Sequence, residues 1–116
     1  LDLPLLRYVC TLNGFDEIAL TKLDVLQGLD TIRVCVGYKV NGERTDIFAP
    51  WRDDITDVEP IYEDFPGFDT DISGATNIDE LPATAMTLIE FIEQQVNTPI
   101  RTVSVGPART ATLARA

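Results

Sequence analysis

Apolar residues recur at helical spacing in two parts of the chain. The first part covers residues 3–12, where Asp2 is placed to cap a helix and Pro4 lies in its first turn. The second part begins near Leu81-Pro82 and runs to about Val96, and its apolar residues share one face: Leu81, Ala85, Leu88, Ile89, Ile92 and Val96. The pattern predicts an amphipathic helix in each part.

Two short apolar runs lack alternation, which is typical of strands covered on both faces. One run ends at Leu20, and the other covers residues 100–104. Each is followed by a loop, and Gly28 closes a short helical turn predicted over residues 24–27. These runs predict the two core strands of an α/β sheet.

The segment between the core strands has a different period. Residues 31–40 alternate, with Ile32, Val34, Val36, Tyr38 and Val40 on one face. Asn41-Gly42 then predicts a hairpin with a return strand over residues 43–48. Another extended segment, residues 58–63, contains Pro60 and should form an edge or bulged strand. We therefore expect one α/β domain over residues 1–116, with an inserted antiparallel hairpin or meander.

The start of the sequence indicates a piece of a longer protein, and the length indicates one domain. The 116 residues are 45% hydrophobic, which suits one compact domain, and no apolar stretch approaches the ~20 residues of a membrane span. The chain opens without an initiator Met or a basic secretory signal, inside a predicted helix. We expect a fragment without a membrane partner.

Charge and composition narrow the possible functions. The formal net charge is −10, and the nine cations form no stripe, so the chain repels nucleic acid and anionic lipid electrostatically. The sequence contains no His, which excludes Ser-His-Asp and Cys-His catalysis within it. Cys10 and Cys35 lie in apolar settings and are interpreted as buried thiols of a cytoplasmic protein.

Candidate chemistry is concentrated in Thr21-Lys22-Leu23-Asp24, directly after the first core strand. In open α/β sheets, ligands bind beyond the carboxyl ends of strands. The Asp24 carboxylate can accept from the N1–H and the 2-amino group of guanine together, while the Lys22 stem lies along the base. Asp24 can equally act as a helix N-cap, and both roles stay open at this stage.

Three other features have simpler interpretations. Residues 69–80 match a calcium-loop pattern from Asp69 to Glu80, but the preceding residues cannot form the required helix, so a polar loop is expected. The acidic cluster, Asp53, Asp54, Asp57 and Glu59, is expected to be a solvated surface. Trp51 can stack on a ligand or seal the end of a sheet.

Several blocks in order carry a family resemblance: NGFDEIALTKLDVLQGLD, VCVGYKVNGE, VEPIYEDFPGF, DELPATAMTLIEFIEQQVNTPI and VSVGPART. They resemble the C-terminal portion of adenylosuccinate synthetase, from Leu1 to about Thr110. The resemblance implies a fragment of a P-loop-type, mostly parallel sheet. It also implies a cytoplasmic, homodimeric ligase that uses GTP and magnesium to join IMP and L-aspartate.

The resemblance assigns specific residues. Lys22, Leu23 and Asp24 match the family's guanine-recognising triplet, and Ser104, Val105 and Gly106 match its second guanine loop. Val105 replaces the usual Thr. The replacement should have a mild effect on base binding if this position contacts the base through its backbone N–H, and it should remove one contact if the hydroxyl makes it. No catalytic or metal-binding residue is assigned here, because the family's phosphate loop and catalytic Asp and His lie upstream. The fragment should therefore recognise guanine without turnover.

A function of another class remains at this stage. A strongly acidic chain with open sheet edges could instead be a free-standing protein-interaction domain. If the chain is a fragment, its exposed edges should favour self-association.

Overall fold

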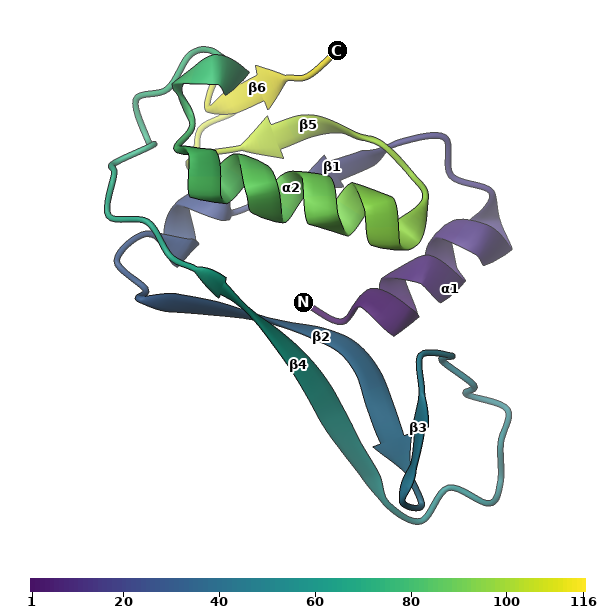
Figure 1. Ribbon diagram of the computed structural model, residues 1–116. Coiled ribbons are helices and arrows are strands. Elements are labelled where there is room, and N and C mark those ends of the chain that lie inside the picture. The colour runs from purple at the N-terminus through teal and green to yellow at the C-terminus, as the bar shows by residue number, and fades with distance from the viewer.

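The computed structural model describes residues 1–116, which form two helices, six strands and two short 3-10 helices (Figure 1). In chain order the elements are α1 (Leu3–Asn13), β1 (Ile18–Leu20), η1 (Leu23–Leu26), β2 (Thr31–Val40), β3 (Glu43–Thr45), β4 (Val58–Pro66), η2 (Ile78–Glu80), α2 (Ala83–Val96), β5 (Ile100–Ser104) and β6 (Thr112–Ala114). The α/β class and both predicted helices are confirmed.

The first sheet has the strand order β1-β5-β6. The two predicted core strands pair in parallel, with Leu20 opposite Val103, so their carboxyl ends lie at the same edge. Strand β6 adds antiparallel to β5. The sequence pattern did not predict β6, because only Leu113 among its three residues is buried.

The second sheet is the inserted antiparallel meander, with the order β3-β2-β4. Strand β4 is an edge strand, as Pro60 predicted. The strict alternation expected along β2 is wrong, because its register shifts between Cys35 and Gly37. This bulge places Cys35 in the interior directly after Val34.

Three element boundaries differ from expectation, and the first is that of β4, which ends at Pro66 instead of residue 63 because its pairing with β2 continues to Thr31. The return strand β3 ends at Thr45 instead of residue 48, because the following loop turns toward α1 and packs Phe48 against Tyr8 with ring centroids 5.3 Å apart. Helix α2 begins at Ala83 because Leu81, which precedes Pro82, is extended with ψ near 143°.

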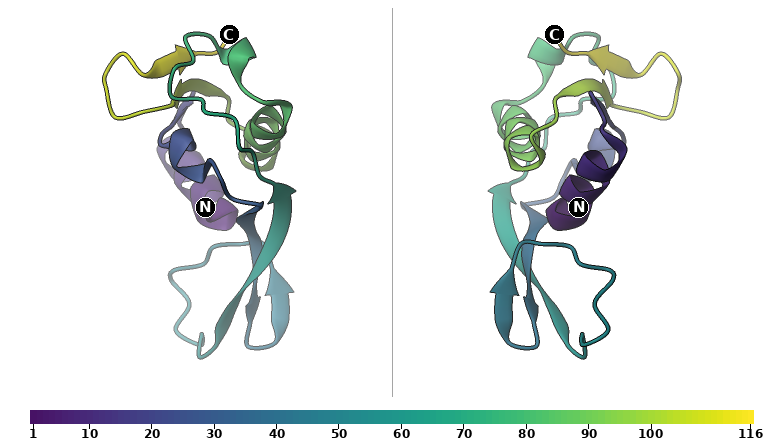
Figure 2. Two further views of the ribbon diagram at one scale, coloured as in Figure 1. Left: turned by 90° about the vertical axis from the view of Figure 1, so that its left-hand side faces the viewer. Right: turned by 90° about the vertical axis from the view of Figure 1, so that its right-hand side faces the viewer.

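Helix α2 supplies much of the core. It lies across the face of the β1-β5-β6 sheet, while the β2–β4 ribbon projects away from it (Figures 1 and 2). Five of its residues are buried, namely Ala85, Leu88, Ile89, Ile92 and Val96. Neither α1 nor α2 combines the length and apolar composition that a membrane-crossing helix needs.

Candidate functional site

The loops that follow β1 and β5 meet at one edge of the parallel pair. The backbone N–H of Lys22 donates to the Ser104 hydroxyl over 2.9 Å, joining residues that are 82 positions apart. Lys22 adopts a left-handed backbone with φ of 62°, which is uncommon for a residue with a side chain. Strained backbone of this kind clusters at ligand sites. The predicted juxtaposition of the two loops is therefore present.

Asp24 is the second residue of η1 and is half-buried. The N-cap position of η1 is occupied by Lys22, and no side chain caps this helix. The Asp24 carboxylate accepts no hydrogen bond and forms no ion pair in the chain. The N-cap interpretation of Asp24 is thus wrong, and its carboxylate is available to a ligand.

The two neighbours of Asp24 in the predicted triplet have different environments. Leu23 is 1% exposed and anchors the loop in the core. The Lys22 side chain is exposed and pairs with no carboxylate. A fixed backbone therefore carries one free cation with a long aliphatic stem beside one free carboxylate.

The second loop contributes a hydroxyl and a backbone donor. Ser104 Oγ accepts from Lys22, so its own hydrogen remains free to donate. Gly106 is half-buried as a residue, and its N–H donates to no acceptor in the chain. Val105 is completely buried, and its N–H donates to the Ala111 carbonyl over 2.9 Å. Val105 thus supports the loop from inside.

By their hydrogen-bonding types, these groups would suit one edge of a 2-amino-6-oxopurine. A free carboxylate suits the adjacent N1–H and 2-amino donors, and a free N–H or O–H suits the 6-oxygen. Adenine has no donor at position 1 and would leave the carboxylate unpaired. Groups of these types can discriminate between bases, and they include no nucleophile–base pair for chemistry.

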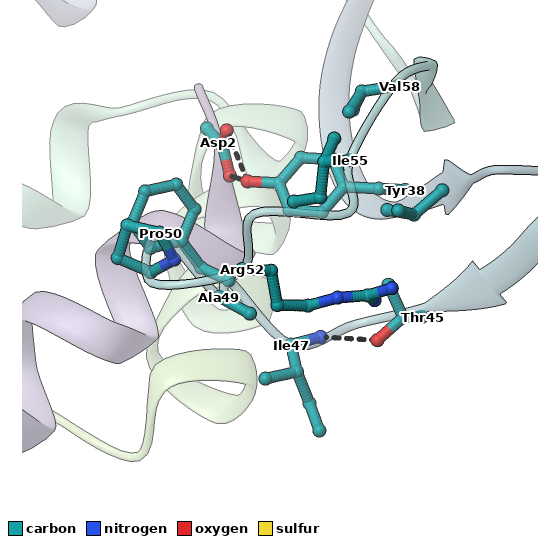
Figure 3. A pocket seen from close by; sticks show the side chains of 11 residues that line it. Asp2, Tyr38, Thr45, Ile47, Ala49, Pro50, Arg52, Ile55 and Val58 are labelled. Atoms are coloured by element: carbon teal, nitrogen blue, oxygen red, sulfur yellow. Dashed lines mark hydrogen bonds between the residues drawn. The ribbon is translucent and has the colours of Figure 1, made fainter.

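Two cavities lie near other elements. A mostly apolar groove of about 300 Å³ begins beside Thr21 and Lys22 and extends between β2 and α2. The largest cavity, about 410 Å³, lies at the far end of the β2–β4 ribbon and contains none of the predicted site residues (Figure 3). There Tyr38 donates to the Asp2 carboxylate over 2.6 Å; burial first, and then this contact, raise the pKa of the phenol.

The alternative metal interpretation has no geometric support. Asp71 accepts from the Ser73 N–H, while the Glu80 carboxylate accepts from Thr76, and the loop forms no cluster of ligands. The acidic stretch at residues 53–59 is solvated, and Arg52 neutralises Asp54. Trp51 is exposed and packs on Tyr8 with ring centroids 5.9 Å apart.

Sequence reasoning missed two contacts that hold the site's elements. Glu93 of α2 accepts from the Ile100 N–H at the start of β5 and from Arg115 after β6. Gly67 donates to the Asp30 carbonyl over 3.0 Å just after η1. The turn signal Pro66-Gly67 was visible in the sequence, but its partner was not. The Glu93 contact had no local signal, since its partners are 7 and 22 positions away.

Comparison with known proteins gives one consistent result. The family model described as adenylosuccinate synthetase matches residues 1–113. The chain is 46% identical over 111 residues to adenylosuccinate synthetase 2 of Methanosarcina acetivorans, covering 96% of the chain and 26% of that relative. It is also 46% identical over 109 residues to the adenylosuccinate synthetase of Salinibacter ruber, covering 94% of the chain and 25% of the relative.

A solved structure agrees. The fully ligated adenylosuccinate synthetase of Plasmodium falciparum superposes with a TM-score of 0.92 at 42% identity, covering the whole chain and 28% of that structure. The chain spans about a quarter of the length of the curated relatives it matches. These matches give no support to a free-standing acidic interaction domain. The chain is a fragment that belongs to the adenylosuccinate synthetase family.

Proposed function

We propose that this chain is the C-terminal, guanine-recognising portion of a GTP-dependent ligase that joins IMP and L-aspartate to give adenylosuccinate. The carrying observation is the Lys22–Ser104 hydrogen bond, which joins the two loops while the nearby Asp24 carboxylate stays unpartnered. Asp24 selects the 2-amino-6-oxopurine edge. Lys22 lies along the base, Gly106 and Ser104 offer donors to it, and Leu23 and Val105 hold the loops.

The rest of the reaction depends on groups outside this chain. GTP supplies the phosphoryl group that activates the 6-oxygen of IMP. The aspartate amine then displaces the resulting phosphate. Phosphoryl transfer needs magnesium and cations around the phosphates. The chain offers no cluster of three carboxylate or thiol ligands and has a net charge of −10, so its residues do not fit that task. We assign magnesium and catalysis to the longer polypeptide, and to this chain only the base.

The proposal extends to the setting of the whole enzyme. We place it in the cytoplasm as a homodimer with a P-loop-type, mostly parallel sheet, of which β1 and β5 are two neighbouring strands. Cys10 and Cys35 are both free thiols, which suits a reducing compartment. No nucleic acid or membrane partner is proposed.

The experiment on the chain itself is NMR titration with GTP and ATP. The expected dissociation constant for GTP is millimolar or weaker, because one charge-assisted pair contributes only about 1.5–3 kcal/mol. GTP should shift the amide signals of Asp24, Ser104 and Gly106, and ATP should shift them much less. Equal shifts with both nucleotides would reject the base assignment.

The experiment on the longer enzyme is Asp24→Asn. The amide keeps an acceptor for N1–H but presents a donor to position 2, which suits the 2-oxygen of xanthosine triphosphate. We expect kcat/KM for GTP to fall roughly 10- to 100-fold and that for xanthosine triphosphate to rise. Asp30→Asn, at an exposed residue beyond η1, is the matched control and should change neither. An unchanged ratio between the nucleotides in Asp24→Asn would contradict the proposal.

A further inference from the structure

One edge of β2 is open along its first half. Strand β4 pairs with β2 from Thr31 to Val40, whereas on the other side β3 reaches only Tyr38, Lys39 and Val40. The open part of this edge is met only by the start of the chain. The Cys35 N–H donates to the Leu1 carbonyl over 2.9 Å, and Asp2 forms an isolated parallel bridge with Cys35.

The remaining donors of this edge can be located from the pairing pattern. Because successive N–H groups of a strand point to opposite sides, the N–H groups of Arg33 and Thr31 face the same side as that of Cys35. The residue opposite Thr31 on β4 is Pro66, which has no N–H and needs no partner there. Two backbone donors therefore line the open edge beyond Leu1.

The apolar groove of about 300 Å³ lies beside this edge. Its floor comes from α2 and β2, through the buried residues Leu88, Ile92 and Ile32. On its rim, Leu1 is 57% exposed and Val25 is 63% exposed. A strip of apolar surface next to unpaired strand donors is what an added strand would cover.

We propose that the residues preceding Leu1 in the longer polypeptide continue the parallel pairing along β2, past Arg33 to Thr31, and cover this groove. The inference rests on the proposed function in that it takes the chain as part of a longer enzyme. Direction and length both favour this occupant. A strand that reaches Asp2 parallel to β2 must pass Thr31 and Arg33 first, and the relatives are about four times longer than this chain.

The added strand would also lie beside the loop that holds Lys22. The groove is lined by Thr21 and Lys22 as well as by α2 and β2. The Arg33 N–H would donate to the carbonyl two residues before Leu1, following the pattern set by Cys35 and Leu1. The loop that holds Lys22 would then be bounded by a strand instead of by solvent.

Amide hydrogen exchange measured by NMR tests the proposal. It compares the chain 1–116 with a chain that also carries the native residues encoded before Leu1. We expect the Arg33 and Thr31 amides to exchange at least tenfold more slowly in the extended chain. The amides of Ile32 and Val34 face β4 and serve as internal controls that are slow in both chains. Equal exchange of Arg33 and Thr31 in both chains, or a gene that encodes nothing before Leu1, would overturn the proposal.

A pair of variants gives a second readout. Proline is tolerated at the first residue of a strand when its N–H position faces an open edge. Thr31→Pro and Thr31→Ala should therefore melt at similar temperatures in the chain 1–116. In the extended chain, Thr31→Pro should melt lower than Thr31→Ala, because it deletes a donor to the added strand. The same Pro–Ala difference in both chains would contradict this pairing.

The outcomes separate this proposal from the guanine assignment. Protection of Arg33 and Thr31 without selectivity for GTP would reject the base site and leave the added strand. Selectivity for GTP without protection of Arg33 and Thr31 would reject the added strand and leave the base site.

Discussion

Lys22 adopts a backbone conformation that lowers the stability of the fold. Its left-handed backbone, with φ of 62°, costs a residue with a side chain about 1–2 kcal/mol. Glycine would adopt it without strain, although it loses about 0.5–1 kcal/mol more chain entropy on folding. A lysine at this position is understandable if its stem lies along a base.

We therefore predict that Lys22→Gly leaves the free energy of unfolding unchanged or raises it by up to about 1 kcal/mol, while GTP binding weakens. Thermal unfolding and NMR titration of the same variant measure the two effects. Asn97→Gly is the matched control, because Asn97 also has a positive φ of 52° but ends α2 away from the two loops. It should change stability in the same direction and leave binding unaltered.

Glu93 makes the stability of the fold depend on pH. Burial alone would raise the pKa of this carboxyl, but hydrogen bonds from Arg115 and the Ile100 N–H, with the nearby charges of Arg115 and Arg101, lower it below its usual range. A carboxyl whose pKa is lower in the folded state stabilises the protein above its unfolded-state pKa. That stabilisation is lost as the pH falls through the folded-state pKa.

We predict that Glu93→Gln lowers the free energy of unfolding by about 1–3 kcal/mol at pH 7. Since the wild-type carboxyl is itself neutral in acid, the difference between the two proteins should shrink below about pH 4. Urea unfolding at a series of pH values measures it. Glu90→Gln, at an exposed residue of the same helix with no ion pair, should show almost no difference at any pH. A pH-independent loss in Glu93→Gln would show that shape, not charge, is what matters there.

At the scale of elements, the turn after β4 contacts the turn after η1 at Gly67. A Cβ at this position would lie 1.5 Å from the backbone carbonyl oxygen of Leu29, which cannot move aside as the end of a flexible side chain could. The Gly67 N–H also donates to Asp30, and the Gly28 N–H donates to the Phe68 carbonyl. These contacts fix the segment that follows η1, and η1 carries Asp24.

Gly67→Ala should therefore lower the free energy of unfolding by about 3 kcal/mol or more and should also weaken GTP binding. Gly74→Ala is the control, since a Cβ there meets nothing within 4 Å. Chemical unfolding of both variants measures the difference. Equal stability of the two would show that the Leu29–Gly67 approach is not maintained in solution.

The elements that could be predicted from sequence are those whose cause is local. The apolar stripe of α2, the cap at Asp2 and the Asn41-Gly42 turn each act within a few residues. Strand β6 and the end of β3 depend on partners outside their own segments. Strand β6 pairs with Val103 and Ser104 of β5, and β3 ends where the loop turns to pack Phe48 on Tyr8. No window of sequence contains both halves of such a contact.

The candidate site divides in the same way. That Lys22 and Ser104 lie together was predictable from the ends of two parallel strands, whereas the base contacts assigned to Lys22, Asp24, Ser104 and Gly106 stay predictions. The supporting role of Val105 could not be predicted from sequence. Its side chain is buried and its N–H is bound to Ala111 only in the folded chain, where β6 lies next to β5. The supporting contacts of Glu93 and Gly67 likewise depend on tertiary structure.

At the scale of the whole molecule, the chain keeps a core but leaves edges open. A cluster of 17 buried residues joins α2 to both sheets. Strand β1 nevertheless ends its sheet with one unpaired side, and β2 is half open as described above. Several large apolar side chains are also exposed, among them Leu12, Phe15 and Val25. Open edges and apolar surface together favour association between copies.

Net charge opposes this association. Copies with a charge of −10 repel each other, and the repulsion is screened within about 10 Å at 0.1 M salt. We therefore predict that the chain 1–116 forms dimers or larger species whose population rises with protein concentration and with added sodium chloride. Sedimentation velocity between about 20 mM and about 500 mM salt, over which the Debye length falls from ~20 Å to ~4 Å, measures this association. The extended chain, in which an added strand covers β2, should associate less at every salt concentration. A strictly monomeric profile of the chain 1–116 at high concentration and high salt would show that these edges do not attract one another.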